Sequence, residues 1–115
     1  RTLSLWGGNF GTDLTIVSKL VNLQNLFVND EFVTSLSGIE NLQKLEVFCM
    51  DGTNATDISP LTKLPRLQVV RLQGVPIVEF APLFSCHSLQ EVEADSSQKE
   101  KIEQLGDPVF MIFVE

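Results

Sequence analysis

The stretch LPRLQVVRLQG, residues 64–74, changes its apolar period part of the way along. Leucine or valine recurs at positions 64, 67, 70 and 72, so two steps of three residues are followed by a step of two. An amphipathic helix would keep steps of three and four, and a half-buried strand would keep steps of two. The phrase therefore predicts a coiling segment that passes directly into a short strand.

The same phrase recurs along the chain. It appears as LVNLQNLFV at 20–28 and IENLQKLEV at 39–47, as a weaker copy SLQEVEA at 88–94, and as an opening TLSL at 2–5. Segments that repeat at such intervals bury their apolar side chains against neighbouring repeats, which predicts a stacked solenoid. Counted along the chain, the intervals between the expected core strand positions are 23, 19, 25 and 22; these positions are Leu3, Leu26, Leu45, Val70 and Val92.

These intervals and the L-x-x-L-x-L core resemble the leucine-rich repeat family over nearly the whole chain. The segment TDISPLTKLPRLQVVRLQGVPI, residues 56–77, is most similar to the short-repeat class of the internalins and phosphatase regulators. The resemblance implies an α/β solenoid: parallel strands on the concave face, and short helical, 3₁₀ or irregular segments on the convex side. One departure is the family's loop asparagine, whose expected places hold Gly8, Glu31, Met50, Val75 and Ser97. We interpret the chain as a divergent, irregular member.

We expect residues 1–115 to form a single domain of five to six repeats, either a fragment or a small irregular array. Residues 14–21 place apolar side chains on one helical face after Asp13, a candidate N-cap. TDISPL and EFAPLF predict short 3₁₀ segments, and DGTNAT (51–56) predicts an insertion. A helix is expected at about 98–105, with Ser97 and Glu100 as its capping box and Gly106 after its end. PVFMIFVE predicts a last strand.

The net charge of −7 is concentrated at the C-terminal end. Residues 1–78 hold 7 acids and 6 bases, whereas residues 79–115 hold 8 acids and 2 bases. Nucleic acid binding requires many Lys and Arg side chains, so we expect no nucleic acid partner. A basic protein surface remains a candidate partner, although acidic surfaces more often serve solubility. No apolar run approaches the about 18 residues of a membrane span, so no membrane insertion is predicted.

The cysteines and the single histidine do not form a recognisable active site. Cys49 and Cys86 occupy unrelated repeat positions, which favours a reducing, cytoplasmic compartment; secretion or cell-surface display stays open. His87 adjoins Cys86, but neighbours in extended structure point their side chains apart. Metal-ligand spacings such as C-x-x-C are absent from the sequence. We therefore expect no enzyme activity and no cofactor.

The resemblance places function on the strand face, where residues between the core leucines point outward. The expected columns are Thr2, Asn25, Lys44, Val69 and Glu91; then Ser4, Phe27, Glu46, Arg71 and Glu93; then Trp6, Asn29, Phe48, Gln73 and Asp95. The last strand is expected to add Met111, Phe113 and Glu115. The candidate protein-binding residues are Trp6, Asn25, Phe27, Asn29, Lys44, Glu46, Phe48, Arg71, Gln73, Glu93 and Asp95.

Two features of this face are specific expectations. Trp6, Phe27 and Phe48 fall on consecutive strands and are expected to form an aromatic patch at its centre. In the middle column, Arg71 is expected between the carboxylates of Glu46 and Glu93.

The favoured function is a protein–protein interaction module, an assignment that rests on fold analogy and names no partner. The alternative is a structural or capping segment of a larger repeat protein. Carbohydrate binding ranks third, because Trp6 is unaccompanied by tyrosines. The final strand offers an unpaired edge through which a second copy or a neighbouring domain could pair.

Overall fold

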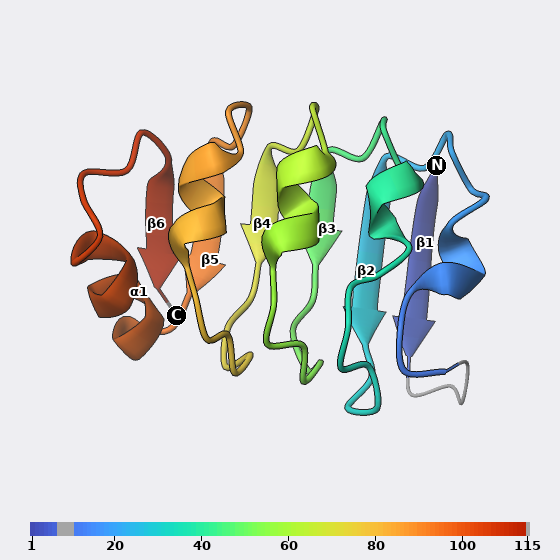
Figure 1. Cartoon of the computed structure of the whole chain (residues 1–115), viewed down its shortest axis with the longest axis horizontal. Helices are drawn as coiled ribbons and strands as arrows, with labels where there is room; N and C mark the ends of the chain where they lie inside the picture. The colour runs from blue at the N-terminus through green and yellow to red at the C-terminus, as the bar shows by residue number, and fades with distance from the viewer. Residues whose placement is uncertain (7–10, 115) are drawn as a thin grey trace.

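The computed structural model describes residues 1–6 and 11–114, and within them the chain winds into a succession of stacked coils. Each coil contributes a strand to one parallel sheet, and the strands lie side by side in chain order (Figure 1). The six strands of the described residues are β1 (Thr2–Trp6), β2 (Asn25–Asn29), β3 (Val47–Cys49), β4 (Val69–Arg71), β5 (Glu91–Ala94) and β6 (Met111–Val114). The predicted α/β leucine-rich repeat solenoid is confirmed.

The segments that cover the other side of the sheet are short. Those in the described part of the chain are four 3₁₀ turns, η1 (Thr15–Val17), η2 (Ile39–Asn41), η3 (Ser59–Lys63) and η4 (Ala81–Ser85), and the helix α1 (Ser96–Glu103) toward the C-terminal end (Figure 1). The 3₁₀ predictions for TDISPL and EFAPLF are confirmed. The helical face predicted over 14–21 is confirmed only in part. Leu14 and Val17 are buried, but only Thr15–Val17 coils, with Leu14 rather than Asp13 as its N-cap, and Leu20 and Val21 are exposed.

The pairing of the strands shows repeats of more even length than the spacing of apolar residues predicted. Leu26 pairs with Phe48, Phe48 with Val70, and Val70 with Val92, so three successive intervals are equal in length. The first interval, from Leu3 to Leu26, is longer by a single residue. The expected intervals of 19 and 25 were therefore wrong, and residues 51–56 are not an insertion. Leu45, which was assigned to the strand, lies in the turn before β3.

The regular spacing builds the core. Apolar side chains recur at this constant interval at several positions of the coil, and each set stacks into a ladder between the sheet and the 3₁₀ turns. Leu45 belongs to one such ladder and Phe48 to the next, so both are fully buried. Burial alone could not distinguish the two registers. The ladder that contains Leu45 is Leu23, Leu45, Leu67 and Leu89, and the one that contains Phe48 is Leu26, Phe48, Val70 and Val92.

Short polar side chains start two of the convex turns in the same way. Asp13 accepts the backbone N–H of Thr15, and Asp57 accepts that of Ser59, each through Oδ1 at 3.0 and 2.9 Å. Such turns fix the backbone direction by satisfying an N–H that has no partner in so short a coil. They help to set the direction in which the chain enters η1 and η3.

The helix α1 is the convex segment between β5 and β6. Its capping box is formed by Asp95 and Gln98, rather than by the predicted Ser97 and Glu100. The buried Gln98 side chain also donates to the carbonyls of Leu72 and Val75, at 2.7 and 3.0 Å. These bonds satisfy two carbonyls of the segment after β4 and tie α1 to the preceding repeat. Among the described residues, no helix is long and apolar enough to cross a membrane.

Candidate binding site on the concave face

The face of the sheet turned away from the 3₁₀ segments, here called the concave face, carries two full columns of side chains. Their composition changes along the sheet, from polar and aromatic residues on β1 and β2 to acidic and apolar residues on β5 and β6. The first column is Thr2, Asn25, Val47, Val69, Glu91 and Met111, and the second is Ser4, Phe27, Cys49, Arg71, Glu93 and Phe113. Glu115, expected at the end of the last strand, lies outside the described residues.

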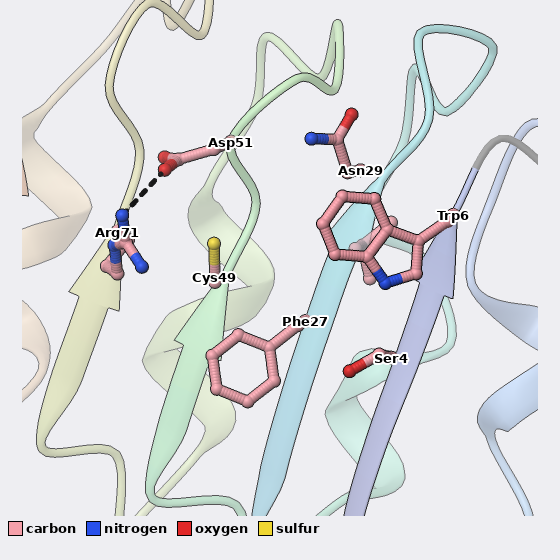
Figure 2. Close-up of a pocket in the computed structure, with 8 residues that line it drawn as sticks. Ser4, Trp6, Phe27, Asn29, Cys49, Asp51 and Arg71 are labelled. Carbon is pink, nitrogen blue, oxygen red and sulfur yellow. Dashed lines mark ion pairs between the residues drawn. The ribbon is translucent and has the colours of Figure 1, made fainter.

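A hollow of about 390 Å³ lies on this face over β1–β4. Figure 2 shows the Trp6 indole over one side of it and the Phe27 ring lying toward β3. Trp6 is 71% exposed, Phe27 is half-buried, and Cys49 is 8% exposed between Phe27 and Arg71. Two of the three aromatics expected in the patch are therefore together, on adjacent strands.

The hollow has a polar border at the ends of the strands. Asn29 ends β2, and its side chain lies against Gly52, where an added Cβ would overlap the Asn29 amide. At the other end of β2, Asn25 donates to the Thr2 hydroxyl at 3.1 Å. Of the two, only Asn29 lines the hollow, and the hydrogen bond holds Asn25 beside Thr2 on the adjacent strand.

Arg71 lies between two carboxylates, as predicted, but one partner differs. Its guanidinium is 3.4 Å from Asp51 and 3.3 Å from Glu93 (Figure 2 shows the pair with Asp51). The predicted partners were Glu46 and Glu93, so Asp51 stands where Glu46 was expected. The three side chains are roughly a quarter to a third exposed, so the pairs are screened by water and contribute modestly to stability. Their main effect is to fix the direction of Arg71.

Three predicted site residues do not lie on the concave face, because the third repeat is shifted by three positions. Phe48 is fully buried in the core. Glu46 is in the turn before β3, where its carbonyl accepts the N–H groups of Gln68 and Val69. Lys44 is also in this turn, and its Nζ donates to Asn22 at 2.9 Å.

Gln73 and Asp95 follow the strands and have structural contacts. The backbone N–H of Gln73 donates to Asp51 at 3.0 Å. Both carboxylate oxygens of Asp95 accept backbone N–H groups, one from Gln98 in the capping box and one from Gly74. These contacts hold Asp95 and the backbone of Gln73 in the loops after β5 and β4, and neither residue lines the hollow.

Three residues that the sequence analysis did not select belong to this face, namely Val47, Cys49 and Asp51. A constant interval between repeats would have found them, because it places them beside Val69, Arg71 and Gln73.

The Cys49 thiol at the hollow and the Cys86 thiol at the end of η4, on the convex side, are both held in their protonated form. Burial raises the pKa of the Cys49 thiol, and burial raises the pKa of the Cys86 thiol to about 11. A protonated thiol is a weak nucleophile. Within residues 1–6 and 11–114, no group of three His, Cys, Asp or Glu side chains is arranged to hold a metal ion. The arrangement is suited to contact with another molecule through shape, aromatic surface and charge.

Solved structures with the same fold include two proteins of Listeria monocytogenes. The chain is 30% identical to internalin C2, with a TM-score of 0.67, over 73% of this chain and 37% of that one. It is 22% identical to an internalin, inlF, with a TM-score of 0.58, over 73% of this chain and 32% of that one. The chain thus spans about a third of the length of either protein. No protein-family model matches the chain, and no curated protein matches it.

Proposed function

Because the chain is a divergent, internalin-like leucine-rich repeat protein, we propose that it is a protein-interaction module that binds its partner through the concave face. The observation that carries the proposal is the hollow beside Trp6, whose side chain is 71% exposed. A large apolar side chain in water is unfavourable in the free protein and favourable once covered. Tryptophan is also enriched among the residues that dominate protein interfaces.

The surroundings of the hollow support the same function. An apolar centre formed by Trp6 and Phe27 is bordered by Asn29, Asp51 and Arg71, and protein interfaces commonly have an apolar centre and a polar rim. The Arg71 side chain is already held by its ion pairs with Asp51 and Glu93 in the free protein. Binding would therefore restrict it little further, which lowers the entropic penalty of binding. The proposal assigns the site no catalysis and no cofactor.

The test begins with capture of binding proteins from the source organism, with the chain as bait. The affinity of each purified partner is then measured by calorimetry for the parent, Trp6→Ala, Phe27→Ala and the control Ile16→Ala. Ile16 is 61% exposed on η1, on the opposite side of the sheet. We expect each concave substitution to weaken binding by about 2 kcal/mol or more, roughly thirtyfold, and the control to leave it unchanged.

Two outcomes would count against the proposal. Folded Trp6→Ala and Phe27→Ala variants that bind as tightly as the parent would place the partner on another surface. Loss of affinity only in Ile16→Ala would assign binding to the convex side. Either result would favour the alternative, in which the strand face is structural within a longer repeat protein.

A further inference from the structure

Resting on that proposed function, we propose that the concave face recognises an extended, basic peptide segment of its partner. The segment carries an apolar anchor residue for the hollow and a lysine or arginine about three or four residues away. The proposal follows from two zones on one face: the apolar hollow over β1–β4 and the acidic surface on β5.

The first zone accepts the anchor. Its walls include Trp6 and Phe27, and Cys49 lies in it with a protonated thiol rather than a charge. At about 390 Å³ it lies at the small end of the range for sites that enclose small molecules. A single aromatic or branched aliphatic side chain is therefore a suitable occupant.

The second zone attracts a cation. Glu91 and Glu93 lie two residues apart on β5 and point to the same face. Glu93 shares Arg71 with Asp51, so one guanidinium is balanced by two carboxylates. Within the described part of the chain, Glu91 forms no ion pair. The same end of the chain carries 8 of the 15 acidic residues against 2 bases, so the field over β5 favours a basic partner segment and disfavours an acidic one.

The distance between the zones sets the spacing in the partner. Parallel strands lie about 4.8 Å apart, so the two or three strand spacings from β2 and β3 to β5 amount to about 10–14 Å. An extended peptide advances about 3.3 Å per residue, so three or four residues cover this distance. Such a peptide would cross the strands obliquely, with its anchor over Cys49, beside the Phe27 ring, and its cation over Glu91.

The chain supplies its own reporter for the test. Trp6 is its single tryptophan, tyrosine is absent from the sequence, and the indole lies at the hollow. The probes are synthetic peptides without tryptophan or tyrosine, each with one phenylalanine and one lysine separated by one to seven positions in a Gly/Ser background. Matched peptides carry glutamate or glycine in place of lysine. Each is titrated while the emission of Trp6 is recorded.

We expect the Trp6 emission to shift to shorter wavelength, with the highest affinity when phenylalanine and lysine are three or four residues apart. Replacement of lysine by glutamate should weaken binding, and added salt should reduce the difference. Glu91→Gln should lower the affinity for the lysine peptide about threefold and leave the affinity for the glycine-substituted peptide unchanged. Glu103→Gln, which makes the same charge change at an exposed position of α1, should have no effect.

Three results would overturn the proposal: affinity independent of charge or spacing, a preference for the glutamate peptides, or no emission change at about millimolar peptide. These results leave the proposed function standing if a captured partner still loses affinity with Trp6→Ala. Conversely, a captured partner whose affinity is unchanged by Trp6→Ala would contradict the proposed function, even if the peptides bind. The two failures can therefore be told apart.

Discussion

Replacing Phe48 with alanine tests where the third strand lies. Phe48 is fully buried, and its neighbours across the sheet are Leu26 on β2 and Val70 on β4. Removal of a fully buried phenyl ring lowers the free energy of unfolding by about 3–5 kcal/mol, because apolar burial is lost and a cavity remains in the core. Domains are stabilised by only about 5–15 kcal/mol in total, so a large part of the stability would be lost. Phe27→Ala, which removes a half-buried ring on β2, should lower the free energy of unfolding by only about 1 kcal/mol.

The free energy of unfolding is measured by urea denaturation followed by far-ultraviolet circular dichroism. If Phe48→Ala is too unstable to study, Phe48→Leu keeps most of the apolar volume and should cost about 1–2 kcal/mol. Equal losses for Phe48→Ala and Phe27→Ala would refute the equal-interval register. They would mean that Phe48 shares the partly exposed environment of Phe27.

Three further substitutions probe the turns, the thiols and the charged centre. Gly38→Ala should cost about 1–3 kcal/mol more than Gly74→Ala in thermal unfolding, because both glycines have positive φ but only at Gly38 would the Cβ lie 2.6 Å from the Leu14 carbonyl; equal losses would contradict this contact. The raised pKa of the Cys86 thiol, about 11 against an ordinary 9.0, means that the folded state holds its proton more tightly than the unfolded chain. The free energy of unfolding should therefore fall between about pH 9 and pH 11, less so in Cys86→Val, and identical slopes would refute the assignment. Arg71→Met should lose about 1 kcal/mol or less at low ionic strength and less at high salt, whereas a salt-independent loss would argue against ion pairing.

Much of the fold could be predicted because the apolar pattern is tied to the coil. The change of period at residues 64–72 marked the passage from turn to strand, and β4 begins at Val69. The proline-containing phrases gave η3 and η4, since proline at the start of a turn has a suitable φ and lacks an N–H to satisfy. The apolar, aromatic phrase at the end gave β6, with Met111 and Phe113 on the concave face.

The register of the third repeat could not be read from the local pattern. Apolar residues at 39, 42, 45, 48 and 50 fit the L-x-x-L-x-L phrase in two phases, because the turn before a strand and the strand itself both bury side chains three residues apart. The choice of Leu45 over Phe48 moved the whole repeat by three positions. Requiring equal intervals between repeats would have selected Phe48 as the strand residue, since coils of equal length stack with the least distortion.

The candidate site was predicted correctly in the repeats whose strand register was right and wrongly in the third repeat. The residues that lie where the alternation predicted are Trp6, Asn25, Phe27, Asn29, Arg71 and Glu93. Lys44, Glu46 and Phe48 do not, and Val47, Cys49 and Asp51 take their place on the face. Asp51 therefore replaces Glu46 as the second partner of Arg71.

Side-chain footprinting of the chain with its captured partner measures most directly whether the concave hollow is the binding surface. Hydroxyl radicals modify exposed aromatic and aliphatic side chains. Trp6, Ile16 and Phe32, which lies in the turn after β2 and outside the hollow, are all more than half exposed in the free protein. If the partner binds in the hollow, modification of Trp6 and of the half-buried Phe27 should fall in the complex, while modification of Ile16 on the convex side stays unchanged. Unaltered modification of Trp6, together with protection of Ile16 or Phe32, would contradict binding through the concave face.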